Sequence, residues 1–192
     1  YRPGSQKAIH CRSGKVKLEE YCDRNEIPWK RSGKLIVATD DSQITQLREL
    51  ERRAGANGVE YRWLSQEEVK DFEPHVQSVA ALSIPEAGVV DYGEVCKAFV
   101  QQLKVMGATL QYNTCIDGCH ETDQESELLA SGESLRARVV VNCAGLYSDR
   151  MAKLFSLPLP GQIVPFRGEY YALKAEYQSL CRTLIYPVPN PK

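Results

Sequence analysis

The chain has 192 residues, of which 43% are hydrophobic and 26% are charged. This composition is ordinary for a folded α/β protein, and a chain of this length buries enough surface to need no disulfide bonds. The 24 lysines and arginines nearly balance the 25 aspartates and glutamates, so no overall field favours nucleic acid or acidic membranes as partners. No apolar run approaches the roughly 18 residues that cross a bilayer.

The seven cysteines are odd in number and irregularly spaced, which argues against a secreted disulfide framework and for a reducing compartment. Cys115, Cys119 and His120 form a C-x3-C-H pattern without the second ligand pair that zinc sites usually have, so we expect no metal site. The first residue is Tyr1 rather than Met, and no signal peptide follows. We therefore expect a piece of a longer protein.

The first half of the chain predicts helices that alternate with short strands. Apolar spacing over residues 5–26 predicts one amphipathic helix or two short ones, ended by Pro28. Ser65 and Glu68 form a capping box, which predicts a short helix that stops before Pro74. We further expect strands over 35–38, 59–64, 79–84 and 88–90, and helices over about 42–54 and 92–106.

The second half contains more strands. We expect a strand over 109–116 and a hairpin over 127–137 that turns at Gly132. Val139, Val140 and Val141 form an unalternating β-branched run, which is typical of a central parallel strand buried on both faces. A helix capped by Ser148 or Asp149 and running to Phe155, a long strand over 163–173 and a strand over 184–188 complete the prediction.

The fold class is therefore mixed, α/β with α+β features. Helix–strand–helix stretches typical of a wound sheet are interleaved with strands that look antiparallel. A nucleotide-binding domain interrupted by a substrate domain would give this pattern. A single α+β domain is the alternative.

The segment with the clearest chemical meaning runs Val-Val-Val-Asn-Cys-Ala-Gly-Leu over 139–146. The small residues Ala144 and Gly145 permit close approach of the backbone to a ligand. A helix start beyond them offers free amides to an anionic or polar group, and ligands of open sheets bind at this end of the strands. The alternative is a tight strand-to-helix turn that simply requires glycine.

This segment resembles the late FAD-contacting strand of the D-amino-acid-oxidase and glycine-oxidase group of flavoproteins. Extended to Arg150, it resembles more narrowly the L-2-hydroxyglutarate oxidases and dehydrogenases. Four further segments resemble that family in the same order along the chain, at 33–38, 85–92, 163–171 and 185–189. Five ordered matches are more specific than any one alone.

The resemblance implies a two-domain flavoprotein fold. Residues 1–27 and 89–160 would form part of the wound sheet of an FAD-binding domain, and residues 28–88 and 161–192 part of an antiparallel-sheet substrate domain. The resemblance also implies backbone contacts to FAD. The residues concerned are Ile116, near the adenine, with Cys143, Ala144, Gly145 and Leu146.

Arg167 is the substrate-facing candidate, because a guanidinium fork suits bidentate recognition of a carboxylate. Its alternative role is a structural ion pair with Glu169 or with another acid. Tyr170, Tyr171 and Tyr186 are candidates for the pocket lining, although aromatic strand residues are more often ordinary core.

The chain also departs from the family pattern. Its thirteen glycines contain no G-x-G pair, the element whose amides hold the FAD pyrophosphate. None of the three histidines matches the family's histidine segments, so no catalytic base is identified. We therefore expect the isolated chain to be inactive and to bind FAD weakly at most.

For the full-length protein, the resemblance implies oxidation of L-2-hydroxyglutarate, or a related 2-hydroxy acid, to the 2-keto acid by hydride transfer to flavin. The electrons would pass to a quinone, a carrier protein or oxygen. The compartment implied is the cytoplasm, or the surface of the inner membrane, which is mitochondrial in a eukaryote.

Three alternatives remain open. One is an amino-acid-oxidase-like enzyme of the same flavoprotein group. Another is a nicotinamide-dependent short-chain dehydrogenase, since residues 142–145 resemble its Asn-Asn-Ala-Gly motif and Tyr170 and Lys174 have its spacing. The third is a non-catalytic module.

Overall fold

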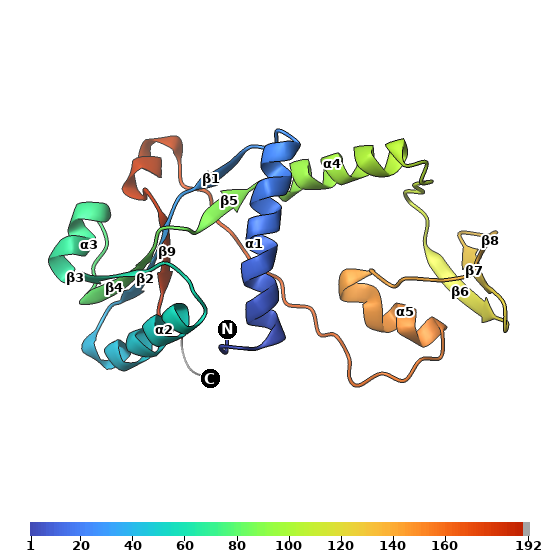
Figure 1. Ribbon diagram of the computed structural model, residues 1–192, viewed down its shortest axis with the longest axis horizontal. Helices are drawn as coiled ribbons and strands as arrows, with labels where there is room; N and C mark the ends of the chain where they lie inside the picture. Colours follow the sequence, from blue (N-terminus) through green and yellow to red (C-terminus); the bar gives the residue numbers. More distant parts are fainter. Residues whose placement is uncertain (190–192) are drawn as a thin grey trace. The chain divides into compact units, whose positions relative to one another are not determined.

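The computed structural model describes residues 1–189, which form two compact units drawn in Figure 1. Unit 1 comprises residues 1–106 together with the described residues from Ala172 onward, and unit 2 comprises Gly107–Tyr171. Helices and both antiparallel and parallel strand pairs occur, which confirms the mixed fold class. The proposed division into an FAD domain and a substrate domain uses other boundaries and stays a prediction.

The main sheet of unit 1 has four strands in the order β3-β4-β2-β9. Strand β2 runs antiparallel to β4 and parallel to β9. Side chains alternate between the two faces of a strand, so both faces of this apolar sheet must be covered. The strand bounds are β2 (Lys34–Ala38), β3 (Arg62–Ser65), β4 (Ala80–Ile84) and β9 (Leu184–Pro187).

Two helices cover the two faces of this sheet. A single 3-10 turn, η1 (Asp41–Gln43), leads into α2 (Ile44–Ala56), whose Leu47 is fully buried against one face with Ala38, Ala80, Leu82, Ile84 and Val188. Helix α3 (Gln66–Phe72) brings Val69 to the other face, against Leu35, Val37, Leu64 and Ala81. The sheet therefore has a hydrophobic core on each of its faces.

The capping box at the start of α3 is confirmed. The Ser65 hydroxyl accepts a hydrogen bond from the Glu68 amide at 3.3 Å, and the Glu68 carboxylate accepts one from the Ser65 amide at 2.9 Å. Just after this helix the carboxylate of Glu73 is completely buried. It accepts hydrogen bonds from the Arg182 amide at 2.9 Å and from the Thr183 hydroxyl at 2.8 Å. Glu73 thus holds the chain in place just before β9.

A second core of unit 1 lies between helices α1 (Gln6–Arg24) and α4 (Tyr92–Val105) and a two-stranded ribbon of β1 (Trp29–Arg31) and β5 (Gly88–Val90). Residues 6–24 form one helix rather than two short ones. The buried members of this core are Cys22, Ile27 and Val95. The core attaches α1 to the ribbon, which positions the site described below.

Unit 2 contains a three-stranded antiparallel sheet of β6 (Ile116–Glu121), β7 (Ser126–Ala130) and β8 (Glu133–Ala137). The hairpin predicted at Gly132 is confirmed, and both Ser131 and Gly132 have positive φ, as a tight hairpin turn requires. The strand predicted over 109–116 is wrong. Pairing with β7 begins only at Ile116, which faces Ala130, so the preceding residues have no strand beside them.

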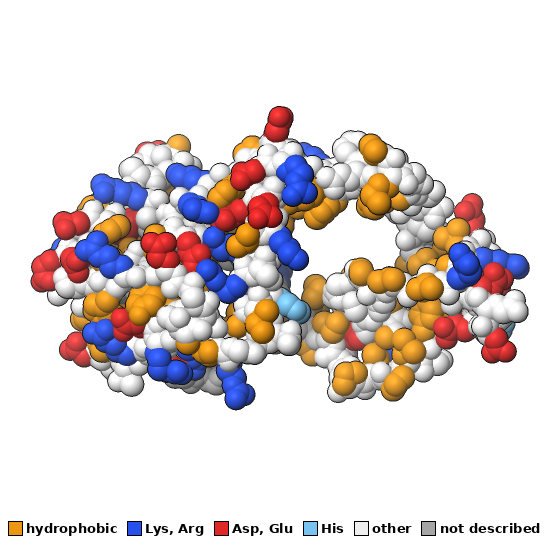
Figure 2. All heavy atoms as spheres, in the orientation of Figure 1, with side chains coloured by type: hydrophobic (Ala, Val, Ile, Leu, Met, Phe, Trp, Pro, Cys, Tyr) orange, Lys and Arg blue, Asp and Glu red, His pale blue; other side chains and the backbone are white. Residues whose placement is uncertain are grey.

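Two other predicted strands are wrong. Residues 139–141 form no strand, and Val139 and Val141 are 78% and 77% exposed. Residues 163–173 are also unpaired, with Phe166 exposed to 92%. Strand-forming side chains give a strand only where a neighbour supplies the hydrogen-bond ladder, and within residues 1–189 none lies beside these segments. Figure 2 shows the resulting apolar surface, in orange, around the α5 segment of unit 2.

Helix α5 (Ser148–Leu154) follows the 3-10 turn η2 (Gly145–Tyr147). The helix was predicted correctly, but its predicted caps were not, because Tyr147 occupies the capping position without a side-chain hydrogen bond. The Asp149 carboxylate is instead turned to two amides, accepting from Arg150 at 2.8 Å and from Ile163 at 3.1 Å. It thereby joins α5 to the segment that follows it.

This contact predicts a pH dependence in unit 2. The hydrogen bond from the Ile163 amide, only partly opposed by burial, lowers the pKa of Asp149 below its ordinary value of 3.8. A lowered folded-state pKa means that the stabilisation is fully present above the ordinary value and is lost as the pH falls through the folded value. We expect the protection factor of the Ile163 amide in hydrogen exchange to fall on acidification below about pH 4, and to be lower and independent of pH in Asp149→Asn, which has no ionisable carboxylate. Equal acid sensitivity of both proteins would contradict this assignment.

Candidate active site

A hollow of about 750 Å³ lies in unit 1, beside α1 and the β1–β5 ribbon. We call it the α1 hollow. Its volume falls in the range of small-molecule sites, roughly 300–1,000 Å³. Its polar lining comes from α1, from the start of β2, from the turn before β5 and from β9, and consists mainly of His10, Lys15, Glu19, Lys34, Glu86 and Tyr186.

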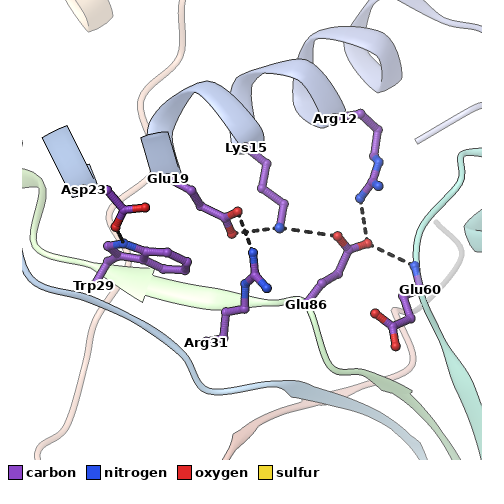
Figure 3. Close-up of polar contacts among 8 residues, drawn as sticks. All are labelled: Arg12, Lys15, Glu19, Asp23, Trp29, Arg31, Glu60 and Glu86. Carbon is purple, nitrogen blue, oxygen red and sulfur yellow. Dashed lines mark hydrogen bonds and ion pairs between the residues drawn. The ribbon is translucent and has the colours of Figure 1, made fainter. Parts of the chain in front are cut away.

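A network of ion pairs runs along this hollow and is drawn in Figure 3. We call it the ionic wall, and it joins Glu19 and Glu86 to Arg12, Lys15 and Arg31. Glu86 forms one part of it. Its carboxylate contacts the Arg12 guanidinium at 2.6 Å and the Lys15 ammonium at 3.4 Å, and it accepts the Glu60 amide at 3.0 Å. Burial acts to raise the pKa of Glu86, but the hydrogen bonds from Arg12 and from the Glu60 amide outweigh it, so the pKa is lowered. Glu86 is therefore an ionised structural group.

Glu19 forms the other part of the wall. It accepts hydrogen bonds from Arg31 at 2.9 Å and from Lys15 at 2.7 Å. The bond from Arg31 is the main reason that the pKa of Glu19 is lowered. Close by, the Trp29 indole donates to Asp23 at 2.8 Å. The carboxylates of Glu19 and Glu86 are thus both engaged with cations and tie α1 to the ribbon (Figure 3).

Lys34 and Tyr186 lie on one face of the main sheet, at its edge with the hollow. In the parallel β2–β9 pair Lys34 faces Leu184 and Ile36 faces Tyr186, so the two side chains are diagonal neighbours. The Lys34 ammonium is 5.6 Å from the centre of the Tyr186 ring. Among residues 1–189 no carboxylate lies within 4.0 Å of it. Sequence reasoning missed Lys34, although a lysine that opens an otherwise apolar strand was a usable signal.

The predicted cofactor turn lies in unit 2 and is organised by Asn142. The Asn142 side chain donates to the Ser148 carbonyl at 2.8 Å and accepts from the Ala144 amide at 3.2 Å. Gly145 has φ +57° and no atom within 4 Å of the position that a Cβ would occupy. Cys143 and Leu146 are exposed beside it. The turn is preformed and open, which fits the backbone contacts expected for FAD.

The remaining predicted site residues belong to different elements, in unit 2 and in unit 1. Ile116 is half-buried at the start of β6, rather than at the end of the strand predicted before it. Arg167 and Tyr171 are exposed on an extended segment of unit 2, whereas Tyr186 belongs to unit 1. The alternative ion pair between Arg167 and Glu169 is not formed among the described residues.

Residues 1–189 contain neither a cluster of side chains suited to a metal ion nor a helix suited to span a membrane. No group of three or more His, Cys, Asp or Glu side chains there is placed to hold a metal ion; Cys115 is exposed and Cys119 half-buried. No helix in the same residues is both long and apolar enough to cross a membrane.

Comparison with known proteins gives relatives over the whole chain. L-2-hydroxyglutarate dehydrogenase from Escherichia coli K12 is 35% identical over 193 residues, which cover all of this chain and 46% of the relative. The mitochondrial L-2-hydroxyglutarate dehydrogenase of Homo sapiens is 37% identical and is covered to 44%. The chain therefore spans about half the length of the curated relatives that it matches.

Solved structures share the fold at lower identity. L-α-glycerophosphate oxidase from Mycoplasma pneumoniae with FAD bound matches 98% of this chain and 52% of its own, with a TM-score of 0.79 and 22% identity. Glycine oxidase from Geobacillus kaustophilus matches 83% of this chain and 45% of its own, with a TM-score of 0.75 and 18% identity.

The nicotinamide-dependent alternative is wrong. Its tyrosine and lysine must lie one turn apart on a helix, whereas the described residues 170–174 are not helical. The family model for FAD dependent oxidoreductases, in contrast, matches residues 1–192. The chain belongs to this family of FAD dependent oxidoreductases.

Proposed function

We propose that the full-length protein carrying this chain oxidises L-2-hydroxyglutarate to 2-oxoglutarate with FAD as its cofactor. The observation that carries the proposal is the similarity to bacterial and mammalian proteins named L-2-hydroxyglutarate dehydrogenase, at 35% and 37% identity over the whole chain. The α1 hollow supports it, because its volume of about 750 Å³ suits a small organic acid.

This chain would contribute backbone contacts to the cofactor, mainly from the turn that follows Asn142. Asn142 holds the turn in shape, and the backbone of Ala144 and Gly145 would contact the dinucleotide, with Cys143 and Leu146 beside it and Ile116 near the adenine. Bound FAD supplies the hydride acceptor for oxidation of the substrate carbon. The sequence has no G-x-G pair, so the chain's share in holding FAD is confined to such contacts, and we propose that the isolated chain is inactive.

The substrate would be held by cationic and aromatic side chains. Arg167 stays the candidate for bidentate contact with a carboxylate, because its guanidinium is accessible and forms no ion pair within residues 1–189. Tyr171 and Tyr186 stay candidates for the pocket lining. In the α1 hollow, Glu19 and Glu86 would act as structural groups, since cations already engage both carboxylates.

The proposed contact of the Gly145 turn with FAD gives a testable prediction. In Gly145→Ala the added Cβ strains a backbone with φ +57°, at a cost of roughly 1–2 kcal/mol, so the turn relaxes and moves its amides. We expect FAD affinity of the full-length protein to fall about tenfold, measured by flavin fluorescence. Gly161→Ala is the matched control, because Gly161 has open space around it and no left-handed φ. Equal FAD affinity of the two variants would refute the role of Gly145.

The substrate is tested by turnover of the full-length flavoprotein. L-2-hydroxyglutarate should give stoichiometric 2-oxoglutarate, while L-amino acids and glycine should give no product. Faster turnover of an amino acid would favour the amino-acid-oxidase alternative, and stoichiometric FAD without turnover of any of these acids would favour a non-catalytic module.

We further propose a small-molecule dicarboxylate as substrate and a separate electron acceptor, either a quinone, a carrier protein or oxygen. The human and mouse relatives are named mitochondrial. For this protein we propose the cytoplasm or a peripheral position on the inner membrane, which is mitochondrial in a eukaryote.

A further inference from the structure

We propose that Lys34 is a carboxylate-binding residue whose ammonium group, with Tyr186 beside it, takes one carboxylate of a small dicarboxylic acid in the α1 hollow. This inference deepens the proposed function and rests on it for the identity of the acid. Lys34 and Tyr186 both line the hollow and belong to unit 1, so the subsite lies within one compact unit.

Among the charged side chains that line the hollow, Lys34 forms no ion pair within residues 1–189. Of the other charged groups that line it, Lys15 bonds to Glu19 at 2.7 Å and contacts Glu86 at 3.4 Å. Glu19 and Glu86 also take Arg31 and Arg12 as partners, so their oxygens are occupied. Lys34 has no carboxylate within 4.0 Å among residues 1–189, although it is half-buried.

A half-buried ammonium without a counter-ion is unfavourable, because desolvation weakens its hydration without a compensating charge. The Tyr186 ring, 5.6 Å away, is within cation–π reach and gives only weak compensation. An ammonium has three N–H donors, and a ring face engages one side of it. The remaining donors suit the oxygens of a carboxylate that enters the hollow.

The position of Lys34 in the fold makes it a stable anchor. It is the first residue of β2, a strand paired on both sides, with β4 and with β9. Lys34 and Tyr186 both stand on strands that the sheet holds by backbone hydrogen bonds. A site built on such strands holds its geometry better than one built on a loop.

The test compares four forms of the full-length flavoprotein: wild type, Lys34→Met, Lys34→Arg and Lys30→Met. Glutarate serves as a non-reacting dicarboxylate, and its Kd is measured by titration calorimetry. Lys30→Met is the matched control, because Lys30 is an exposed lysine four residues away that does not line the hollow. Melting temperatures within a few degrees of wild type confirm that each variant is folded.

We expect Lys34→Met to raise the Kd for glutarate ~10- to 100-fold, as for loss of a hydrogen bond to a charged group. Lys34→Arg, which keeps the charge, should raise it only a few-fold, and Lys30→Met should leave it unchanged. No binding of glutarate to wild type, or the same Kd in wild type and Lys34→Met, would overturn the subsite.

The two proposals fail separately. If glutarate binding depends on Lys34 but wild type does not oxidise L-2-hydroxyglutarate, the subsite stands and the proposed reaction falls. If wild type oxidises L-2-hydroxyglutarate and Lys34→Met keeps the wild-type KM and glutarate Kd, the reaction stands and the subsite falls.

Discussion

Replacement of Glu73 by alanine should lower the free energy of unfolding by about 3 kcal/mol, measured by urea denaturation. The carboxylate of Glu73 is fully buried and accepts the amides of Arg182 and Thr183 as well as the Thr183 hydroxyl. Its removal leaves these partly buried donors without their acceptor. Since this contact holds the chain just before β9, the position of Tyr186 should also become less defined.

Two further variants make this prediction specific. Thr183→Val removes one of the donors to Glu73 and should cost only about 1 kcal/mol. Glu20→Ala, at an exposed position of α1, should change stability by less than about 0.5 kcal/mol. If Glu73→Ala were as mild as Glu20→Ala, Glu73 would not be the anchor of this segment.

Two glycine-to-alanine changes in unit 1 should act in opposite directions. A Cβ on Gly88 would lie 2.8 Å from the Lys30 carbonyl oxygen across the β1–β5 ribbon, so the ribbon must shift, at a cost of about 2 kcal/mol. Gly14 is inside α1 with open space around it, and alanine there should stabilise the helix by about 0.5–1 kcal/mol. The measurement is again urea denaturation of both variants.

The ionic wall serves as an internal check on the Gly88 result. Glu86 and Arg31 stand on either side of the β1–β5 contact and both reach α1 (Figure 3). A shift of the ribbon should therefore also weaken the binding of ligands in the α1 hollow. If Gly88→Ala stabilised the protein as much as Gly14→Ala, the backbones of β1 and β5 would not be in close contact at Gly88.

The parts of the fold that depend on local sequence were predicted well. The capping box of Ser65 and Glu68 and the hairpin at Gly132 are fixed by residues a few positions apart, and the structure has both. A helix satisfies its own backbone, so α1 and α4 could be recognised from apolar spacing and from the proline and glycine that follow them.

Apart from the N-cap of α5, the failures concern contacts between distant residues. The valine run at 139–141 and the segment at 163–173 have strand-forming side chains, but no strand pairs with them among residues 1–189. The contact between Glu73 and Thr183 joins residues 110 positions apart and has no local signature. Of the residues in the candidate site, Tyr186 was found through resemblance, and Lys34 was missed because its role depends on which charges around it are already paired.

The most direct test of the central claim is anaerobic mixing of the full-length flavoprotein with L-2-hydroxyglutarate in a stopped-flow spectrometer. We expect the visible flavin absorbance to bleach completely and one equivalent of 2-oxoglutarate to form for each flavin. The D enantiomer and L-glutamate should leave the flavin oxidised. A flavin that stays oxidised with L-2-hydroxyglutarate, or that is reduced faster by L-glutamate, would refute the proposed oxidation of L-2-hydroxyglutarate.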